Sequence, residues 1–443
     1  MQVNTTYRDI WRMAFPVMIG SIAITVVNIT DIVFLGRVGE VELGASALGG
    51  VFYFIIVMIG VAIATGTQIQ IARRAGEKNH SAIGEIFDQS LYLFLALAIV
   101  GFIVLKFLST WLFQYVIQED AVRNASFEFL KYRSIGIFFA MIAMSIRSFY
   151  VGIASLKVWS VYTIILAVLN IILCYVFIFG NLGAPKMGIA GAGLASSISE
   201  LIALIFLLIY TVMKPGIKQF RLFRFERIKL EPIKKILTLS APLIVQNLIS
   251  TGAWFLFFVF IEKTGKHSLA ISNIIRSAYN VNVTPIWGFS VAANSMVSNI
   301  IGQGRRSEVM GMINRIIIMA FAVSLFTTMI YVLIPFQLMS IFTSDANLIK
   351  DSLGSLKIVE LATIVFSFSI VCISALSGTG ATRTALYIEI AAIFIYLLYL
   401  WLAVFVFHAS LEWAWSVEIV YWVFTGCICY FYLKSMRWEK IAV

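Results

Sequence analysis

The chain has 443 residues, of which 61% are hydrophobic and only 12% are charged. Soluble domains usually carry about 25% charged residues, so this composition excludes an ordinary soluble protein. It predicts an all-α polytopic membrane protein, and the net charge of +11 is interpreted as an orientation signal instead of a sign of an acidic partner.

Apolar runs of about 20 residues, the length that crosses a bilayer, recur along the whole chain. Twelve of them predict transmembrane helices, near residues 13–35, 45–70, 88–109, 134–156, 160–181, 189–213, 238–261, 269–301, 314–340, 358–377, 385–407 and 415–433.

The first predicted span contains a proline and an acid. Pro16 lacks the N–H that bonds one turn back, so it predicts a bending point; the alternative is that Pro16 starts its helix, where the missing N–H costs nothing. Asp31 lies further along among apolar residues. A charge near the bilayer centre costs about 2.5–3.5 kcal/mol on insertion scales. Asp31 therefore predicts a proton- or cation-binding group, and the alternative is a structural carboxylate bonded to Asn or Ser on a neighbouring helix.

Two more polar residues occur in the fifth and sixth spans. Glu200 lies in the sixth span and Asn170 in the fifth. For Glu200, an ion-binding role and a structural role both remain open, and we expect Asn170 to orient one of the two acids.

The most basic segment, KPGIKQFRLFRFERIKLEPIKK, runs from Lys214 to Lys235. Its interleaved Phe residues could indicate nucleic-acid binding, but we predict a cytoplasmic linker that lies on anionic lipid headgroups. With a cytoplasmic N-terminus, most Lys and Arg residues lie on the inner side, as the positive-inside bias requires. Both termini are therefore expected in the cytoplasm, and no nucleic-acid partner is expected.

The second half repeats the proline and adds polar side chains. Pro242 in the seventh span is the predicted counterpart of Pro16. Arg276 in the eighth span either contacts an anionic substrate group or neutralises Glu262 or another carboxylate. The residues predicted to line a substrate cleft are Asp31, Gln246, Asn247, Asn273, Arg276 and Asn280.

The chain matches itself at an offset of 226 residues. The matched pairs include Pro16 with Pro242, Gly39 with Gly265, and Gly152 with Gly378. Six spans per copy return the chain to its starting side, so the two repeats are predicted to run parallel. The expected organisation is an N-terminal six-helix lobe at 1–213, a basic linker at 214–236 and a C-terminal lobe at 237–443. Such duplicated bundles are typical of transporters, in which similar units rock against each other.

Catalytic and metal-binding patterns are missing from the sequence. Neither the Cys nor the His residues show ligand spacing, and no Gly-rich phosphate loop occurs. An enzyme is therefore not expected, no metal or cofactor is predicted, and the energy for transport is expected from an ion gradient.

Several segments together resemble the multidrug and toxic compound extrusion (MATE) family over nearly the whole chain. They include TDIVFLGRVGE, LNIILCYVFIFG, MGIAGAGLASSISE, GFSVAANSMVSNIIGQG and LSGTGATRTAL. The resemblance implies two six-helix lobes around a central cleft, and export of drug-like organic cations in exchange for H⁺ or Na⁺. We expect a monomer in the plasma (inner) membrane of a prokaryote.

The resemblance also implies roles for single residues. Asp31 and Asn170 match the coupling acid and its partner Asn, and Ser196 stands where the family often has Thr. With Glu200, these residues form the predicted coupling site. Cys174 replaces the family's fifth-span Asp.

Two more family acids are absent: Ser250 stands where one branch has a Glu and Phe366 where it has an Asp. Because Na⁺ prefers several hard oxygen ligands, these losses favour H⁺ as the coupling ion, with Na⁺ as the alternative. The rival function is a flippase for a lipid-linked or anionic amphiphile, which Arg276 favours.

Overall fold

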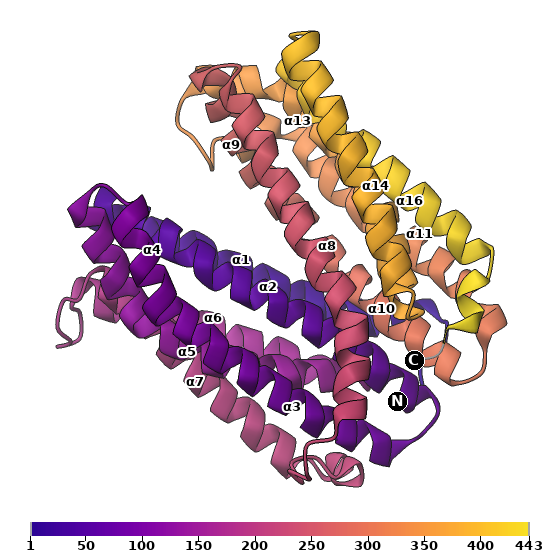
Figure 1. Ribbon diagram of the computed structural model, residues 1–443. Helices are drawn as coiled ribbons and strands as arrows, with labels where there is room; N and C mark the ends of the chain where they lie inside the picture. The colour runs from indigo at the N-terminus through magenta and orange to yellow at the C-terminus, as the bar shows by residue number, and fades with distance from the viewer. Residues whose placement is uncertain (1, 442–443) are drawn as a thin grey trace. The chain divides into compact units, whose positions relative to one another are not determined.

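The computed structural model describes residues 2–441, which consist of helices and their connections (Figure 1). No strand occurs among these residues. Helices bond every backbone N–H and C=O within one segment, which a chain surrounded by lipid requires. The all-α prediction is confirmed.

The chain divides into two compact units. The first contains Ile19–Ser240, and the second contains Gln2–Met18 and the chain from Ala241 onward. Helices α1 (Tyr7–Val38) and α8 (Leu230–Glu262) therefore each contribute to both units. Pro16 and Pro242 lie inside these helices, so the alternative that they start their helices is wrong.

The first unit is organised around one central helix, α5 (Asp120–Gly152). It packs against α2, α3 and α7, and α6 packs against α7. The other helices of this unit are α2 (Glu40–Gly76), α3 (His80–Ile103), which continues through a π-helical turn (Val104–Leu108) into α4 (Ser109–Val116), α6 (Lys157–Phe179) and α7 (Ile189–Met213).

The second unit repeats this organisation around α13 (Ala346–Gly378), which packs against α9, α10, α11 and α16, while α14 packs against α16. The two units therefore share one packing pattern: α13 corresponds to α5, the pair α9 and α10 to α2, α11 to α3, α14 to α6, and α16 to α7. The remaining helices are α9 (Lys266–Val283), α10 (Trp287–Gly302), α11 (Val309–Leu333), α12 (Pro335–Met339), α14 (Thr382–Trp401), α15 (Leu411–Trp415) and α16 (Val417–Lys434).

The matched glycines Gly152 and Gly378 end the two central helices. A Cβ on Gly378 would overlap the backbone of Asn294 in α10, and a Cβ on Gly152 would meet the Ile71 side chain in α2. Glycine at these positions therefore lets each central helix approach the corresponding neighbour in its own unit.

Eleven helices within residues 2–441 are long and apolar enough to cross a membrane. The predicted eighth span, 269–301, is instead made of two shorter helices, α9 and α10, joined by a tight turn at Thr284–Ile286. Pro285 in this turn cannot donate a backbone hydrogen bond, which explains the interruption.

The basic linker is bonded to the first unit. The Asp88 carboxylate on α3 accepts backbone N–H bonds from Phe223, Arg224 and Phe225 at 2.8, 2.9 and 3.2 Å. Phe220, which closes a short 3₁₀ helix (Pro215–Phe220), is only 1% exposed. The linker is thus held in a defined path by charge-assisted hydrogen bonds.

Candidate functional site

Asp31 contacts a cysteine in the first unit. The Cys174 Sγ on α6 lies 3.4 Å from Asp31 Oδ1 and 3.7 Å from Asn170 Oδ1. A thiol has a single hydrogen, so it donates to one of these oxygens at a time. From the sequence, Cys174 was notable only because it stands where the family has an Asp. In the structure, its thiol lies within hydrogen-bonding distance of both the Asp31 carboxylate and the Asn170 amide oxygen.

The polar chain continues from α6 to α7. Asn170 Nδ2 donates to Ser196 Oγ at 3.1 Å, so Asp31, Cys174, Asn170 and Ser196 are connected across three helices. Cys174 and Asn170 are buried, at 0% and 4% exposed. A buried and connected polar chain holds its members in fixed geometry. Three of the four residues predicted to take part in coupling therefore lie together.

The fourth residue, Glu200, has a cationic partner that the sequence did not reveal. Arg133 on α5 donates to both Glu200 oxygens, each at 2.8 Å, and Tyr53 on α2 donates to Glu200 Oε1 at 3.0 Å. The guanidinium lies 3.6 Å from the centre of the Tyr53 ring. The two charged side chains are only 13% and 12% exposed, so this is a buried, bidentate ion pair.

Gly136 provides the room for this pair. A Cβ at that position would lie 2.5 Å from Glu200 and 2.6 Å from Arg133. The Arg133 charge also attracts the Asp31 carboxylate. Among residues 2–441, however, none of the ion pairs includes Asp31. Of the two acids, Asp31 is therefore the one without an ion-pair partner among the described residues, whereas Glu200 is paired with Arg133.

The second unit contains a buried acid that the sequence analysis missed. Glu389 on α14 accepts hydrogen bonds from Ser250 and Tyr421, both at 2.5 Å to Oε1, and Gln246 Nε2 lies 3.5 Å from Oε2. Ser250 stands on α8 where one family branch has a Glu. In this chain its hydroxyl instead donates to the carboxylate of Glu389 on α14. Gln246 contacts that carboxylate directly.

Glu418 on α16 is a second missed acid, surrounded by aromatic donors. It accepts from Tyr396 at 3.1 Å, from Trp254 at 3.3 Å and from Trp422 at 3.1 Å. Glu389 and Glu418 both lie in apolar stretches, LYIEIAAIF and SVEIVYW. The rule that selected Asp31 from the sequence would also have selected these two residues.

Arg276 differs from expectation. Its guanidinium lies 5.0 Å from the centre of the Phe258 ring, and within residues 2–441 it takes part in no ion pair with Glu262 or any other acid. Nearby, Asn273 Nδ2 bonds to the Leu269 carbonyl at 3.0 Å. The expected neutralisation of Glu262 is therefore not found.

Two predicted lining residues remain, and neither of them is buried. Asn247 is partly exposed and Asn280 is exposed. Neither contacts the buried acids through any bond that the structure shows, so the six residues predicted to line a cleft do not form a single cluster of contacts.

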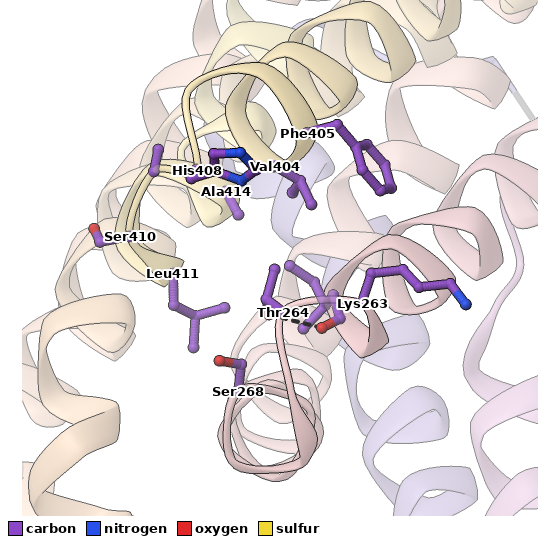
Figure 2. A pocket seen from close by; sticks show the side chains of 11 residues that line it. Lys263, Thr264, Ser268, Val404, Phe405, His408, Ser410, Leu411 and Ala414 are labelled. Atoms are coloured by element: carbon purple, nitrogen blue, oxygen red, sulfur yellow. Dashed lines mark hydrogen bonds between the residues drawn. The ribbon is translucent and has the colours of Figure 1, made fainter.

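A pocket of about 410 Å³ lies at one end of the second unit, between the α8–α9 turn and the segment that leads into α15. Figure 2 shows His408 and Leu411 on one side of it and Thr264 and Ser268 on the other. No acidic residue lines this pocket, so it is separate from the carboxylates described above.

The chain is similar to known proteins along most or all of its length. Residues 16–176 and 242–410 match the model of the MatE family. Probable multidrug resistance protein NorM of Thermotoga maritima is 24% identical, over 100% of this chain and 95% of its own length. Its counterpart in Photorhabdus laumondii is 26% identical, over 82% and 79%.

Solved structures share the fold. One is an outward-facing multidrug resistance MATE family transporter of the MOP superfamily, with a TM-score of 0.90 and 19% identity over 96% of this chain and 95% of that one. Another is a MOP superfamily transporter from Pyrococcus furiosus whose binding pocket of reverse polarity suggests a different function. It has a TM-score of 0.89 and 20% identity over 98% and 97% of the two chains.

Proposed function

Because the chain belongs to the MatE family, we propose that it is a secondary antiporter that exports drug-like organic cations in exchange for protons by alternating access. Family membership makes it a multi-pass membrane transporter and not an enzyme. The substrate class and the exchanged ion are the parts that we propose. The names of the NorM relatives support multidrug export.

Asp31 is the observation that carries the proposal. It is an acid in a long apolar helix, it has no ion-pair partner among residues 2–441, and its hydrogen-bond donor is the neutral Cys174 thiol. A carboxylate in such a place is usually held for a proton, an ion or a substrate. A proton and an organic cation can therefore compete for Asp31, which is the requirement for exchange.

The proposal also covers the membrane in which the chain lies, the side on which its termini lie and the parts that move. We place the chain in the plasma (inner) membrane of a prokaryote as a monomer with both termini in the cytoplasm. The distribution of Lys and Arg supports this orientation. The two compact units, whose boundaries lie between Met18 and Ile19 and between Ser240 and Ala241, are proposed to be the moving lobes.

The test is transport of ethidium, a fluorescent organic cation, by purified protein in liposomes under an imposed pH gradient at clamped voltage. We expect Asp31→Asn to reduce transport to the level of protein-free liposomes. Ethidium binding should weaken less, because an amide oxygen still accepts hydrogen bonds. Asp9→Asn is the matched control, since Asp9 lies in the first turn of the same helix, where it accepts a bond from Thr6. Normal gradient-driven transport by Asp31→Asn would refute the proposal.

The coupling ion has its own test in the same liposomes. Transport that follows a Na⁺ gradient at clamped pH, and ignores the pH gradient, would replace H⁺ by Na⁺ in the proposal. Cys174→Asp restores the missing carboxylate beside Asp31, and we expect it to increase the sensitivity to Na⁺ because it adds a hard oxygen ligand.

Arg276 supports a second candidate function, the translocation of a lipid-linked or anionic amphiphile. Its charge has no acidic partner within residues 2–441, so it is available to an anionic group. Arg276→Gln should abolish movement of a fluorescent anionic lipid analogue if this candidate is right. If Arg276→Gln leaves the movement of the anionic probe unchanged and ethidium transport persists, this second candidate is refuted and the antiport proposal stands.

A further inference from the structure

The pocket at one end of the second unit combines polar and apolar side chains. Ser268 and His408 contribute polar groups to it, and Val404 and Leu411 contribute apolar surface (Figure 2). Its volume of about 410 Å³ lies within the range of about 300–1,000 Å³ that is typical of ligand sites. All of its lining residues belong to the second unit, so the pocket is a property of that unit alone.

The charged groups of this pocket are cationic and uncompensated. Lys263 lines it, and no acidic residue does. Within residues 2–441, neither Lys263 nor His408 takes part in an ion pair. Ser410 precedes α15, but its hydroxyl makes no capping bond to that helix. An anionic group can therefore bind these donors without displacing a carboxylate, and hydrogen bonds to an anion are stronger than neutral ones.

The backbone around His408 has an unusual conformation. Helix α14 ends in a π-helical turn, Leu402–Val406, and His408 follows with a φ of +44°. The N–H groups of the residues on either side, Phe407 and Ala409, bond to carbonyls of that turn, both at 2.9 Å. These bonds hold His408 in the left-handed region. π-turns and left-handed residues other than glycine occur preferentially at functional sites, and this one places an imidazole at the pocket.

The surroundings indicate that the pocket lies at the membrane–water boundary. Helix α8 and the continuous α14 segment are each apolar enough to cross a membrane, and the pocket lies where both end. Four exposed aromatic residues occur in the same stretch: Trp401, Phe405, Phe407 and Trp413. Aromatic side chains gather at the level of the lipid headgroups. The ligand with which this pocket is in contact is therefore a membrane lipid.

We propose that this pocket binds the headgroup of an anionic phospholipid from the leaflet at that end of the helices. The Lys263 ammonium neutralises the phosphate, and the His408 ring donates an N–H bond to it. The hydroxyls of Ser268 and Ser410 bind the rest of the headgroup, and Leu411 contacts the acyl chains. Because no acid lines the pocket, the positive choline of a zwitterionic lipid finds no partner there. The site contains none of the acids described above, and its occupancy does not depend on the proposed antiport.

The experiment is thermal unfolding of the delipidated full chain in a neutral detergent, with titration of dioctanoyl phosphatidylglycerol, dioctanoyl phosphatidylcholine or inorganic phosphate. A ligand that binds only the folded state raises the unfolding temperature in a saturable manner. We expect this increase with phosphatidylglycerol alone. Inorganic phosphate should not compete with the lipid, because it has no acyl chains to contact the apolar lining.

Two variants assign the effect to the pocket. Lys263→Gln should require about fivefold more phosphatidylglycerol for half-saturation, the usual effect of one cation at a lipid surface. His408→Gly should weaken binding as well while keeping the unfolding temperature without lipid. Glycine adopts a positive φ freely, and this relief offsets the freedom that it adds to the unfolded chain. A weaker lipid response in His408→Gly therefore reports the lost imidazole and not a damaged fold.

The matched control is Lys350→Gln. Lys350 is an exposed lysine near the start of α13 that does not line the pocket. Its neighbour Asp351 contacts His267 at the start of α9 at 3.0 Å, so the control removes a charge from the same end of the unit. It should retain the full lipid response.

Equal stabilisation by phosphatidylglycerol and phosphatidylcholine would overturn the proposal, because the pocket would then not distinguish the charge of the headgroup. Competition by inorganic phosphate would replace the lipid by a free anion and would overturn it as well. So would an unchanged response in both Lys263→Gln and His408→Gly, or an equal loss in Lys350→Gln. Asp31→Asn should respond to the lipid normally, so failure of this site is distinguishable from failure of the antiport.

Discussion

The buried pair of Arg133 and Glu200 allows a quantitative test of how the first unit is held together. Removing one partner of a buried ion pair typically costs about 3–5 kcal/mol, because the other charge is left uncompensated. Arg133→Met should pay this cost in full, since methionine still covers the Tyr53 ring but cannot neutralise Glu200. Glu200→Gln should cost less, because its amide oxygen still accepts from Tyr53.

The double variant Arg133→Met/Glu200→Gln removes both charges. Replacement of an entire buried pair is often close to neutral, so we expect it to be more stable than Arg133→Met alone. The coupling energy should be about 2–3 kcal/mol, at the upper end of the range for contacting residues. The assay is unfolding of all four proteins by a denaturing detergent in mixed micelles, followed by circular dichroism. Coupling below about 0.5 kcal/mol would refute our account of this pair.

Three further predictions concern the linker, the central helix of the second unit and the shared first helix. Asp88→Ala removes three charge-assisted hydrogen bonds, each worth about 1.5–3 kcal/mol, and should accelerate trypsin cleavage within residues 221–229; unchanged cleavage would contradict the anchoring. Gly378→Ala places a methyl group against backbone and should lower the unfolding temperature, whereas Gly252→Ala, with open space around it, should not. Pro16→Ala should slow ethidium transport in liposomes while preserving ethidium binding, because it removes the bending point; an unchanged rate would exclude that role.

The sequence predicted the architecture well because its signals are local. Each apolar run is long enough to define a helix by itself, and the matched prolines and glycines show the duplication without any structural information. The interrupted eighth span was harder to predict. Pro285 and the polar residues before it were visible, but periodicity does not show whether a proline bends a helix or ends it.

The candidate site was only partly predictable because its contacts are long-range. Asp31 stood out as an acid in an apolar helix, but its link to Asn170 through Cys174 depends on how α1 packs against α6. Arg133 lay just before a predicted span, and nothing in the sequence connected it with Glu200, 67 residues later. Glu389, by contrast, is visible in the apolar stretch LYIEIAAIF, but the side chains that bond it, Ser250 and Tyr421, come from other helices.

The sharing of α1 and α8 between the units has a consequence for how the chain can be divided. The segment before Ile19 is bonded to the second unit: the Val3 N–H donates to Asn299 Oδ1 at 3.1 Å, and Arg315 donates to the Thr5 carbonyl at 2.5 Å. One cut in the linker would therefore give two fragments, each missing a segment that its unit contains and carrying one that belongs to the other. Such a reciprocal exchange is the pattern of a domain-swapped dimer. In this protein the two swapped copies are fused into one polypeptide, so the fragments should regain their fold only when they are produced together.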